Sequence, residues 1–123
     1  MADYKVTIPF ILPGLNEYTQ YNRWNKYLGA KLKKELEDNL QLVIKNQLIG
    51  VKINPPVYME YLWVEKDMRR DADNIAFAKK FIQDALVKAG VLENDSRKYI
   101  KRFSDDFVED NKNPRIEIKI FEI

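Results

Sequence analysis

The fold is decided by residues 57–90, which read VYMEYLWVEKDMRRDADNIAFAKKFIQDALVKAG. The first nine, Val57 to Glu65, are rich in Tyr, Val, Trp and Leu, a composition typical of a largely buried β-strand. From Phe77 to Ala89 the apolar residues recur at intervals of three and four, which predicts an amphipathic helix. Gly90 follows directly and is suited to end that helix. A buried strand followed at once by such a helix favours an α/β layer architecture.

Upstream of this stretch, the pattern predicts one strand and one long helix. Residues 6–12 form a short apolar run ended by the turn signal Pro13-Gly14, which predicts a strand. The polar and aromatic segment from Asn16 to Asn25 predicts a loop. From about Lys26 apolar residues again recur every three or four positions up to Gly50, which predicts an amphipathic helix.

Downstream, the pattern predicts two more strands. Residues 97–108 carry a weak strand signal, and a turn is expected at residues 111–114. Ile116, Ile118 and Ile120 alternate strictly with charged residues, which predicts a half-buried strand. We therefore expect a single α/β (α+β) domain over residues 1–123, with a mixed sheet, two main helices and the order β-α-β-α-β-β.

Composition removes several kinds of chemistry. The chain has no cysteine and no histidine, which excludes disulfides, thiolate zinc sites and Ser-His or Cys-His nucleophilic triads. An enzyme of this composition must rely on carboxylates, lysines, tyrosines or a metal bound by oxygen ligands, such as Mg²⁺ or Mn²⁺. No signal peptide and no apolar run of about 20 residues is evident, so we expect a cytoplasmic protein without a membrane partner.

The segment Arg69-Arg70-Asp71-Ala72-Asp73-Asn74 joins the buried strand to the following helix. In an extended segment Asp71 and Asp73 would point to the same side and could share a metal ion. A third acid, Asp95, lies beyond a helix about 24 Å long. It reaches the first two only if the chain after Gly90 turns back. A helix cap at Asp73 or Asn74, and an ordinary polar turn around Asp95, remain the alternatives at this point.

Four short motifs in fixed order resemble the core signature of the RusA Holliday junction resolvase family. They are the run Arg69-Arg70-Asp71-Ala72-Asp73-Asn74, then Asp84-Ala85-Leu86, Ala89-Gly90 and Asn94-Asp95-Ser96. More loosely, the opening strand and residues 13–25 resemble the N-terminal region of that family. The resemblance rests on the order of several elements, since none of them is specific alone.

The resemblance implies a catalytic site and its cofactor. In that family three aspartates bind magnesium for phosphodiester hydrolysis, and the matching positions here are Asp71, Asp73 and Asp95. The family also has an active-site lysine, but Phe77 stands at its usual distance from the aspartates. Because the helix of this chain is about one turn longer, Lys80 takes the place of that lysine, with Lys79 as the alternative. The resemblance further implies Mg²⁺, with Mn²⁺ as a possible substitute, a homodimer, and branched DNA as the partner.

Basic residues are concentrated around this motif. Between Lys66 and Arg102 there are ten basic and six acidic residues, an excess of four, which suits contacts to DNA phosphates. Half of these residues could equally serve only to solubilise the surface. The candidates for DNA binding are Arg69, Arg70, Lys79, Arg97, Lys98, Lys101 and Arg102.

The segment with Tyr18, Tyr21, Arg23 and Trp24 mixes aromatic and basic side chains. Such groups can stack on unpaired bases at a branch point, or pack as a lid over the sheet. The leading hypothesis is a magnesium-dependent endodeoxyribonuclease that resolves four-way junctions in DNA recombination and repair. The alternatives are a metal nuclease for other branched nucleic acids, a non-catalytic DNA-binding module, and a regulatory protein that binds a metal or a partner.

Overall fold

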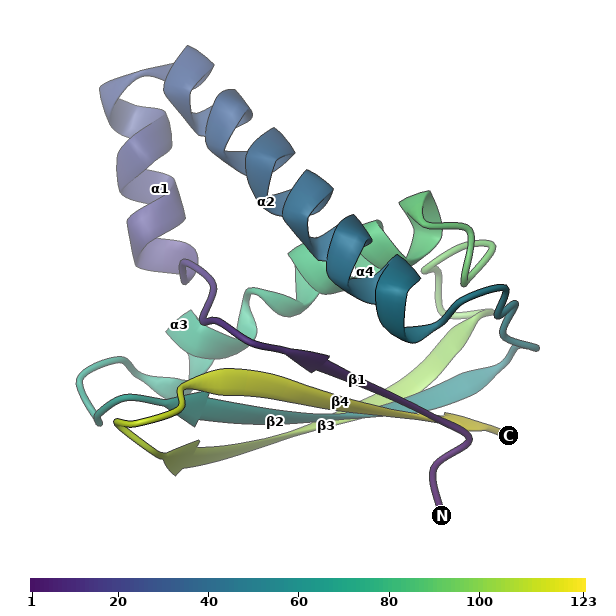
Figure 1. Ribbon diagram of the computed structural model, residues 1–123. Coiled ribbons are helices and arrows are strands. Elements are labelled where there is room, and N and C mark those ends of the chain that lie inside the picture. The colour runs from purple at the N-terminus through teal and green to yellow at the C-terminus, as the bar shows by residue number, and fades with distance from the viewer.

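The computed structural model describes all residues from 1 to 123 and has an α/β architecture with a four-stranded mixed sheet, as the sequence predicts. The elements are β1 Tyr4–Ile8, α1 Leu15–Trp24, α2 Lys26–Gln47, β2 Val57–Glu65, α3 Ala72–Ala76, α4 Lys79–Lys88, β3 Ile100–Glu109 and β4 Arg115–Glu122. All four helices lie over one face of the sheet (Figure 1).

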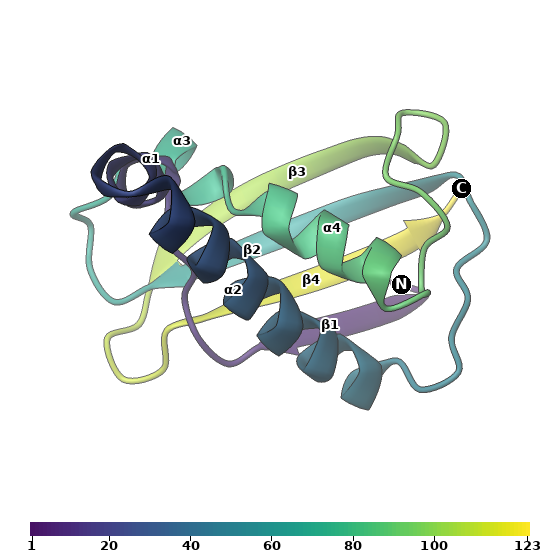
Figure 2. The same cartoon turned by 90° about the horizontal axis from the view of Figure 1, so that it is seen from above.

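The strand order in the sheet is β1-β4-β2-β3. The pairs β1/β4 and β4/β2 are antiparallel, whereas β2 and β3 are parallel. A parallel pair cannot be joined by a short hairpin, and the segment containing α3 and α4 supplies the crossover (Figure 2). The crossover starts where β2 ends, so residues 69–74 lie at the carboxyl end of a parallel strand. Ligands of open α/β sheets bind at such ends.

The core lies between the sheet and the helices. Alternation places Ile116, Ile118 and Ile120 of β4 toward the helices, and each is at most 2% exposed. Tyr61 and Trp63 of β2 are 1% exposed and stack with ring centroids 5.5 Å apart. The strands also contribute Val6, Ile8, Val57, Met59 and Ile100 to the core. The helices and loops contribute Leu12, Leu40, Ile44, Leu48, Ile53, Ile75, Ala78, Phe81, Ile82, Ala85, Leu86, Val91 and Leu92.

An ion pair with a buried carboxylate joins α2 to α4. Glu37 is 4% exposed, accepts a hydrogen bond from Lys88 and lies 3.9 Å from Lys33. This hydrogen bond raises the pKa of Lys88. The carboxylate is thereby paired, as a buried charge must be.

Three details of the predicted order are wrong. The segment predicted as a loop before Asn25 is helix α1, which has no buried residue and therefore shows little apolar periodicity. The second predicted helix is divided into α3 and α4 at Phe77-Ala78. The first strand ends at Ile8, because Pro9 has no N–H to continue the ladder. By contrast, the bounds of β2 agree with the prediction, and Gly50 and Gly90 follow α2 and α4 with φ values of 69° and 78°.

None of the helices combines the length and the apolar character required to cross a membrane.

Candidate active site

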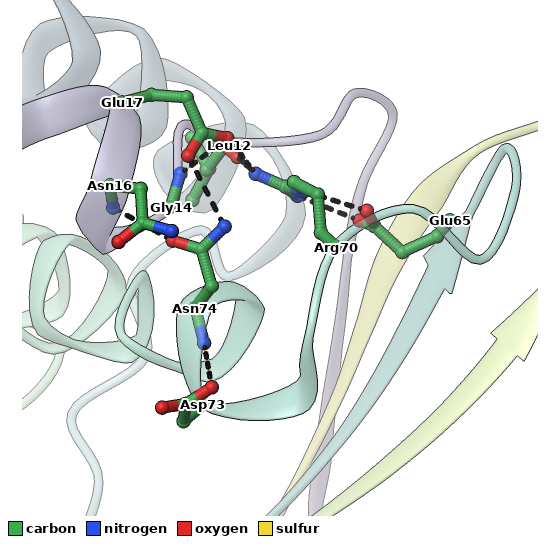
Figure 3. A network of polar contacts seen from close by, with 8 residues as sticks. All are labelled: Leu12, Gly14, Asn16, Glu17, Glu65, Arg70, Asp73 and Asn74. Carbon is green, nitrogen blue, oxygen red and sulfur yellow. Dashed lines mark hydrogen bonds and ion pairs between the residues drawn. The ribbon is translucent and has the colours of Figure 1, made fainter.

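The residues of the motif 69–74 divide between the interior and the surface of the protein. Arg70 and Asn74 point inward, and their side chains hold the start of α1 against α3 and the end of β2 (Figure 3). Asp71 and Asp73 are exposed. Figure 3 shows Asp73 on the side of α3 away from Glu17. The motif therefore contains a structural pair and a pair that is open to ligands.

The guanidinium group of Arg70 donates hydrogen bonds to acceptors in three segments of the chain. Its Nε and Nη2 donate to the two carboxylate oxygens of Glu65 at 2.9 and 2.8 Å, a bidentate arrangement. Its Nη1 donates to the Leu12 carbonyl at 3.0 Å and to Glu17 Oε1 at 2.9 Å. The side chain of Arg70 is only 18% exposed and that of Glu65 only 9%. Arg70 is thus an internal clamp, with little surface left for a phosphate.

Asn74 completes this network from α3. Its Oδ1 accepts a hydrogen bond from the backbone N–H of Asn16 at 2.8 Å, and its Nδ2 donates to Glu17 Oε2 at 3.2 Å. Gly14 is needed at the contact, because a Cβ there would lie 2.5 Å from Asn74 Oδ1 and 2.6 Å from its carbonyl oxygen. The network leaves no buried side-chain nitrogen or oxygen without a partner.

The charges of this network shift the pKa values of its members. Partial burial opposes ionisation of Glu17, but hydrogen bonds from Arg70, from Asn74 and from the backbone outweigh it and lower the pKa of Glu17. Partial burial likewise opposes the charge of Arg70, yet its bonds to Glu65 and Glu17 raise the pKa of Arg70. Both groups are therefore ionised at neutral pH.

Asp71 and Asp73 lie at the start of α3 rather than in an extended segment. Asp71 is the N-cap residue, and Asp73 is in the first turn, so the period-two argument for their shared direction is wrong. The expectation that Asp73 or Asn74 caps the helix is also wrong: the capping position is Asp71, whose side chain makes no capping hydrogen bond. Asp73 Oδ1 accepts a hydrogen bond from the backbone N–H of Asn74 at 2.9 Å.

Asp71 lines a hollow at the carboxyl ends of the parallel strands β2 and β3. The hollow extends between the loop after β2 and the end of β3. Its other lining residues include Glu65, Asp67, Ile75, Phe107 and Glu109. Of its acidic residues, Glu65 is paired with Arg70 and Asp67 with Arg69, whereas Asp71 and Glu109 make no ion pair.

Asp95 lies beside Lys80, because the chain after Gly90 turns back along α4. The Nζ atom of Lys80 is 3.5 Å from Asp95 Oδ2 and 3.1 Å from Asp84 Oδ1. The hydrogen bond with Asp84 and the nearby charge of Asp95 raise the pKa of Lys80. The side chain of Lys80 is 60% exposed. Two predicted site residues, Lys80 and Asp95, are thus in contact at an accessible place.

The structure does not bring the three predicted metal ligands together. No group of three or more acidic side chains could hold a metal ion in the single chain. Asp71 faces the hollow after β2, Asp73 bonds to its neighbour in α3, and Asp95 pairs with Lys80. The residues present in one chain therefore do not form a complete three-aspartate metal site.

The two adjacent lysines at the start of α4 have different surroundings. Lys79 is 13% exposed and donates to Asp105 Oδ2 of β3 at 2.5 Å. Its ammonium group also lies 4.4 Å from the centre of the Phe103 ring. Trp63 Nε1 donates to the other oxygen of Asp105 at 2.8 Å. Lys79 therefore joins the crossover to the sheet, whereas Lys80 faces Asp95.

Five of the seven predicted DNA contacts are exposed, and the other two, Arg70 and Lys79, are engaged in the internal ion pairs described above. The guanidinium of Arg102 lies 4.8 Å from the centre of the Tyr58 ring on the open face of the sheet. The five exposed residues are Arg69, Arg97, Lys98, Lys101 and Arg102.

Four acidic residues of these networks, Glu17, Glu65, Asp84 and Asp105, were not predicted as site residues from the sequence. Asp84 is four positions after Lys80, and this spacing on a helix is itself a signal for an ion pair. Glu17 lies three positions after Gly14 and accepts its backbone N–H at 3.4 Å, the spacing of a capping box. Its bonds to Arg70 and Asn74 had no local signal, since these residues are more than fifty positions away.

The chain matches a known protein family over most of its length. The model of the family described as Endodeoxyribonuclease RusA matches residues 14–121 of the 123-residue chain. The class is thus a nuclease that acts on DNA. The chain belongs to the RusA endodeoxyribonuclease family, a family of Holliday junction resolvases, and the resemblance carried by residues 69–96 is confirmed. No curated protein matches the chain significantly.

Proposed function

We propose that this protein is a magnesium-dependent endodeoxyribonuclease that resolves four-way DNA junctions by paired strand cleavage in recombination and repair. The observation in the structure that supports this is the contact between Lys80 and Asp95. These residues are fifteen positions apart, yet the turn after Gly90 brings them within 3.5 Å on an exposed face of α4. Because an exposed ion pair contributes little to stability, both groups can exchange this contact for a phosphate or a cation.

Mg²⁺ is the proposed cofactor, with Mn²⁺ as a substitute. The chain offers oxygen ligands and no histidine or cysteine, which suits these hard cations. Asp71, Asp73 and Asp95 are the proposed ligands by family position. Bound at the scissile phosphate, such an ion would supply charge stabilisation and an activated water. The three carboxylates do not form one group in the single chain, so the proposed assignment of the ligands rests on family position and on their accessibility.

Lys80 is proposed to contact the DNA at the scissile position. Its exposed ammonium group, whose pKa is raised by the adjacent carboxylates, is charged at every pH at which the nuclease would act. Such a group can donate to a phosphate oxygen or stabilise the leaving oxygen. Lys79 is the weaker candidate for this role, because it is committed to Asp105.

A homodimer is proposed as the active form. A four-way junction has near two-fold symmetry, and paired cuts on opposed strands need two sites related by a similar symmetry. The exposed basic residues Arg69, Arg97, Lys98, Lys101 and Arg102 are proposed to contact the phosphate backbone, which provides affinity without sequence discrimination.

Cleavage of a synthetic four-way junction, compared with linear duplex DNA, tests this proposal. In Mg²⁺ the wild-type protein is expected to make paired nicks in the junction, and excess EDTA is expected to abolish them. Asp73→Asn should reduce the cleavage rate by about 100-fold or more, because loss of a metal ligand raises the activation free energy by several kcal/mol.

Asp106→Asn is the matched control, since Asp106 is also exposed but lies on β3, and its side chain makes no ion pair or hydrogen bond in the structure. This variant should cleave like the wild type. Binding of the junction without any cleavage would reject the nuclease assignment in favour of a DNA-binding module.

A further inference from the structure

The turn between α1 and α2 projects away from the sheet and the rest of the molecule (Figure 1). We name its exposed residues the hairpin tip. Asn25 is the single residue between the two helices, with φ −165° and ψ 115°. The members of the hairpin tip are Tyr21, Arg23, Trp24, Lys26, Tyr27 and Leu28.

The hairpin is held in a defined conformation. The N–H of Asn25 donates to the Tyr21 carbonyl at the end of α1, and its side-chain oxygen accepts from the N–H of Tyr27 at the start of α2. The helices pack closely where Gly29 meets Asn22, because a Cβ on Gly29 would lie 2.0 Å from Asn22 Oδ1. A protruding turn with both ends capped presents its side chains with little loss of conformational entropy on binding.

The aromatic side chains of the hairpin tip are exposed to solvent. Trp24 is 71% exposed, Tyr27 75% and Tyr21 42%. Tyr18, one turn earlier in α1, instead packs on Phe77 and Phe81 with ring centroids 6.1 and 5.4 Å away. Of the two expectations for this segment, the packing role therefore applies to Tyr18. The rings of the hairpin tip are open to an external partner, which exposed aromatic clusters commonly indicate.

The charge around the hairpin tip identifies the chemistry of that partner. Residues 18–34 contain no acidic residue and five basic ones: Arg23, Lys26, Lys31, Lys33 and Lys34. Only Lys33 is close to a carboxylate, that of Glu37 at 3.9 Å. In a chain whose net charge is only +2, this is a strong local excess. Basic groups interleaved with exposed rings suit a nucleic acid, whose phosphates and unstacked bases require those two contacts.

The hairpin tip is also connected to the candidate active site. A surface hollow runs along α1 from Phe77 to Trp24 and includes Arg23 and Lys26. Phe77 is one turn beyond Asp73, whose carbonyl accepts its N–H. The base of α1 is bonded to Asn74, the residue next to Asp73. DNA bound at the hairpin tip would therefore be held at a defined position relative to Asp73.

We propose that the hairpin tip is a second DNA site, which stacks Trp24 and Tyr27 on unpaired or unstacked bases at the branch point while Arg23 and Lys26 contact the flanking phosphates. It thereby provides the preference for branched over linear DNA, because an intact duplex has no open base faces. This inference rests on the proposed function in that it assumes a branched DNA substrate. The hairpin tip is proposed to recognise the branched DNA, whereas the aspartates are proposed to act in its cleavage.

The test is binding, measured without cleavage. Anisotropy of a fluorescent four-way junction, and of a duplex of equal length, is titrated with protein in EDTA. The double variant Trp24→Ala/Tyr27→Ala should weaken junction binding by about 10-fold or more, from the loss of two stacking contacts, and duplex binding by less than about 2-fold. Trp24→Phe should retain most of the affinity, because the phenyl ring still stacks.

Leu42→Ala is the matched control, since Leu42 is a 62% exposed apolar residue of α2 outside the hairpin tip. It should bind both substrates like the wild type. A second readout uses the two tryptophans, of which Trp24 is exposed and Trp63 is 1% exposed. Acrylamide should quench Trp24 in the free protein, and the junction should protect it more than the duplex does.

The outcomes separate the two proposals. If the wild type binds the junction but the double variant binds it equally well, or Trp24 remains open to acrylamide in the complex, the hairpin tip is not a DNA site. If sedimentation shows that the double variant loses a dimer that the wild type forms, the hairpin tip is a protein interface, which also overturns the inference. If the wild type prefers no branched DNA at all, the proposed function fails with it.

Discussion

The segment from Arg70 to Asp84 has an ion-pair centre near each end, one around Arg70 and one around Lys80. The two centres differ strongly in burial and in the number of segments that they join. Arg70 is 18% exposed and donates to acceptors from the end of β2, the loop after β1 and the first turn of α1. Lys80 is 60% exposed and lies between two carboxylates, Asp84 and Asp95, at the edge of α4. The first centre joins three segments of the fold, whereas the second joins only α4 to the loop that follows it.

Within one family signature, the difference distinguishes residues that are committed to the fold from residues that remain accessible to a ligand. Because a buried charge is stable only when its hydrogen bonds are complete, Arg70 and Asn74 have no capacity left for DNA. The exposed centre contributes little to stability, since surface ion pairs are worth about 0–1 kcal/mol, and it can exchange its internal partners for a phosphate or a cation. The signature therefore combines residues that hold the fold together with accessible residues that we propose for catalysis.

The largest effect is expected at the buried centre. Arg70→Met should lower the free energy of unfolding by about 3 kcal/mol, because it leaves the 9% exposed carboxylate of Glu65 without its partner. Urea denaturation followed by circular dichroism measures this. Arg69→Met, a change at the adjacent exposed arginine, is the control and should stay within about 0.5 kcal/mol. Equal stability of the two variants would remove the distinction between the centres.

A smaller and pH-dependent effect is expected at Glu17. Since its pKa in the folded protein is lowered, its stabilising contribution is present above the pKa of the unfolded state and is lost as the pH falls through the folded value. Glu17→Gln should cost about 1–2 kcal/mol at pH 7 and flatten the acid limb of the curve of stability against pH. Thermal or urea unfolding between pH 7 and pH 3 measures both. An acid limb as steep as that of the wild type would contradict the assignment.

The smallest effect on stability is expected at the exposed centre. Lys80→Ala should change the free energy of unfolding by less than about 0.5 kcal/mol, yet reduce junction cleavage at saturating DNA by about 100-fold. Lys45→Ala, at an exposed lysine near the end of α2, is the control for charge and should leave the cleavage rate unchanged. Unchanged cleavage by Lys80→Ala would remove Lys80 from the active site.

The parts of this protein that follow a local period could be predicted from the sequence. The apolar run of β2, the strict alternation of β4 and the apolar stripe of α2 each identify an element, because burial of one face requires that period. The order of four short motifs likewise identified the family, which the match over residues 14–121 confirms. The position of Asp95 beside Lys80 required the turn after Gly90, which the sequence allowed but did not require.

Helix α1 and the partners of the charged residues were decided only by tertiary structure. Helix α1 buries no residue, and its first turn is held by bonds to Arg70 and Asn74, which lie 53 to 58 positions further along the chain. The adjacent Lys79 and Lys80 are chemically identical, and only Asp105, 26 positions beyond Lys79, makes one of them internal. Periodicity reports which face of an element is buried, but an ion pair depends on distance in space, and only the folded chain sets that distance.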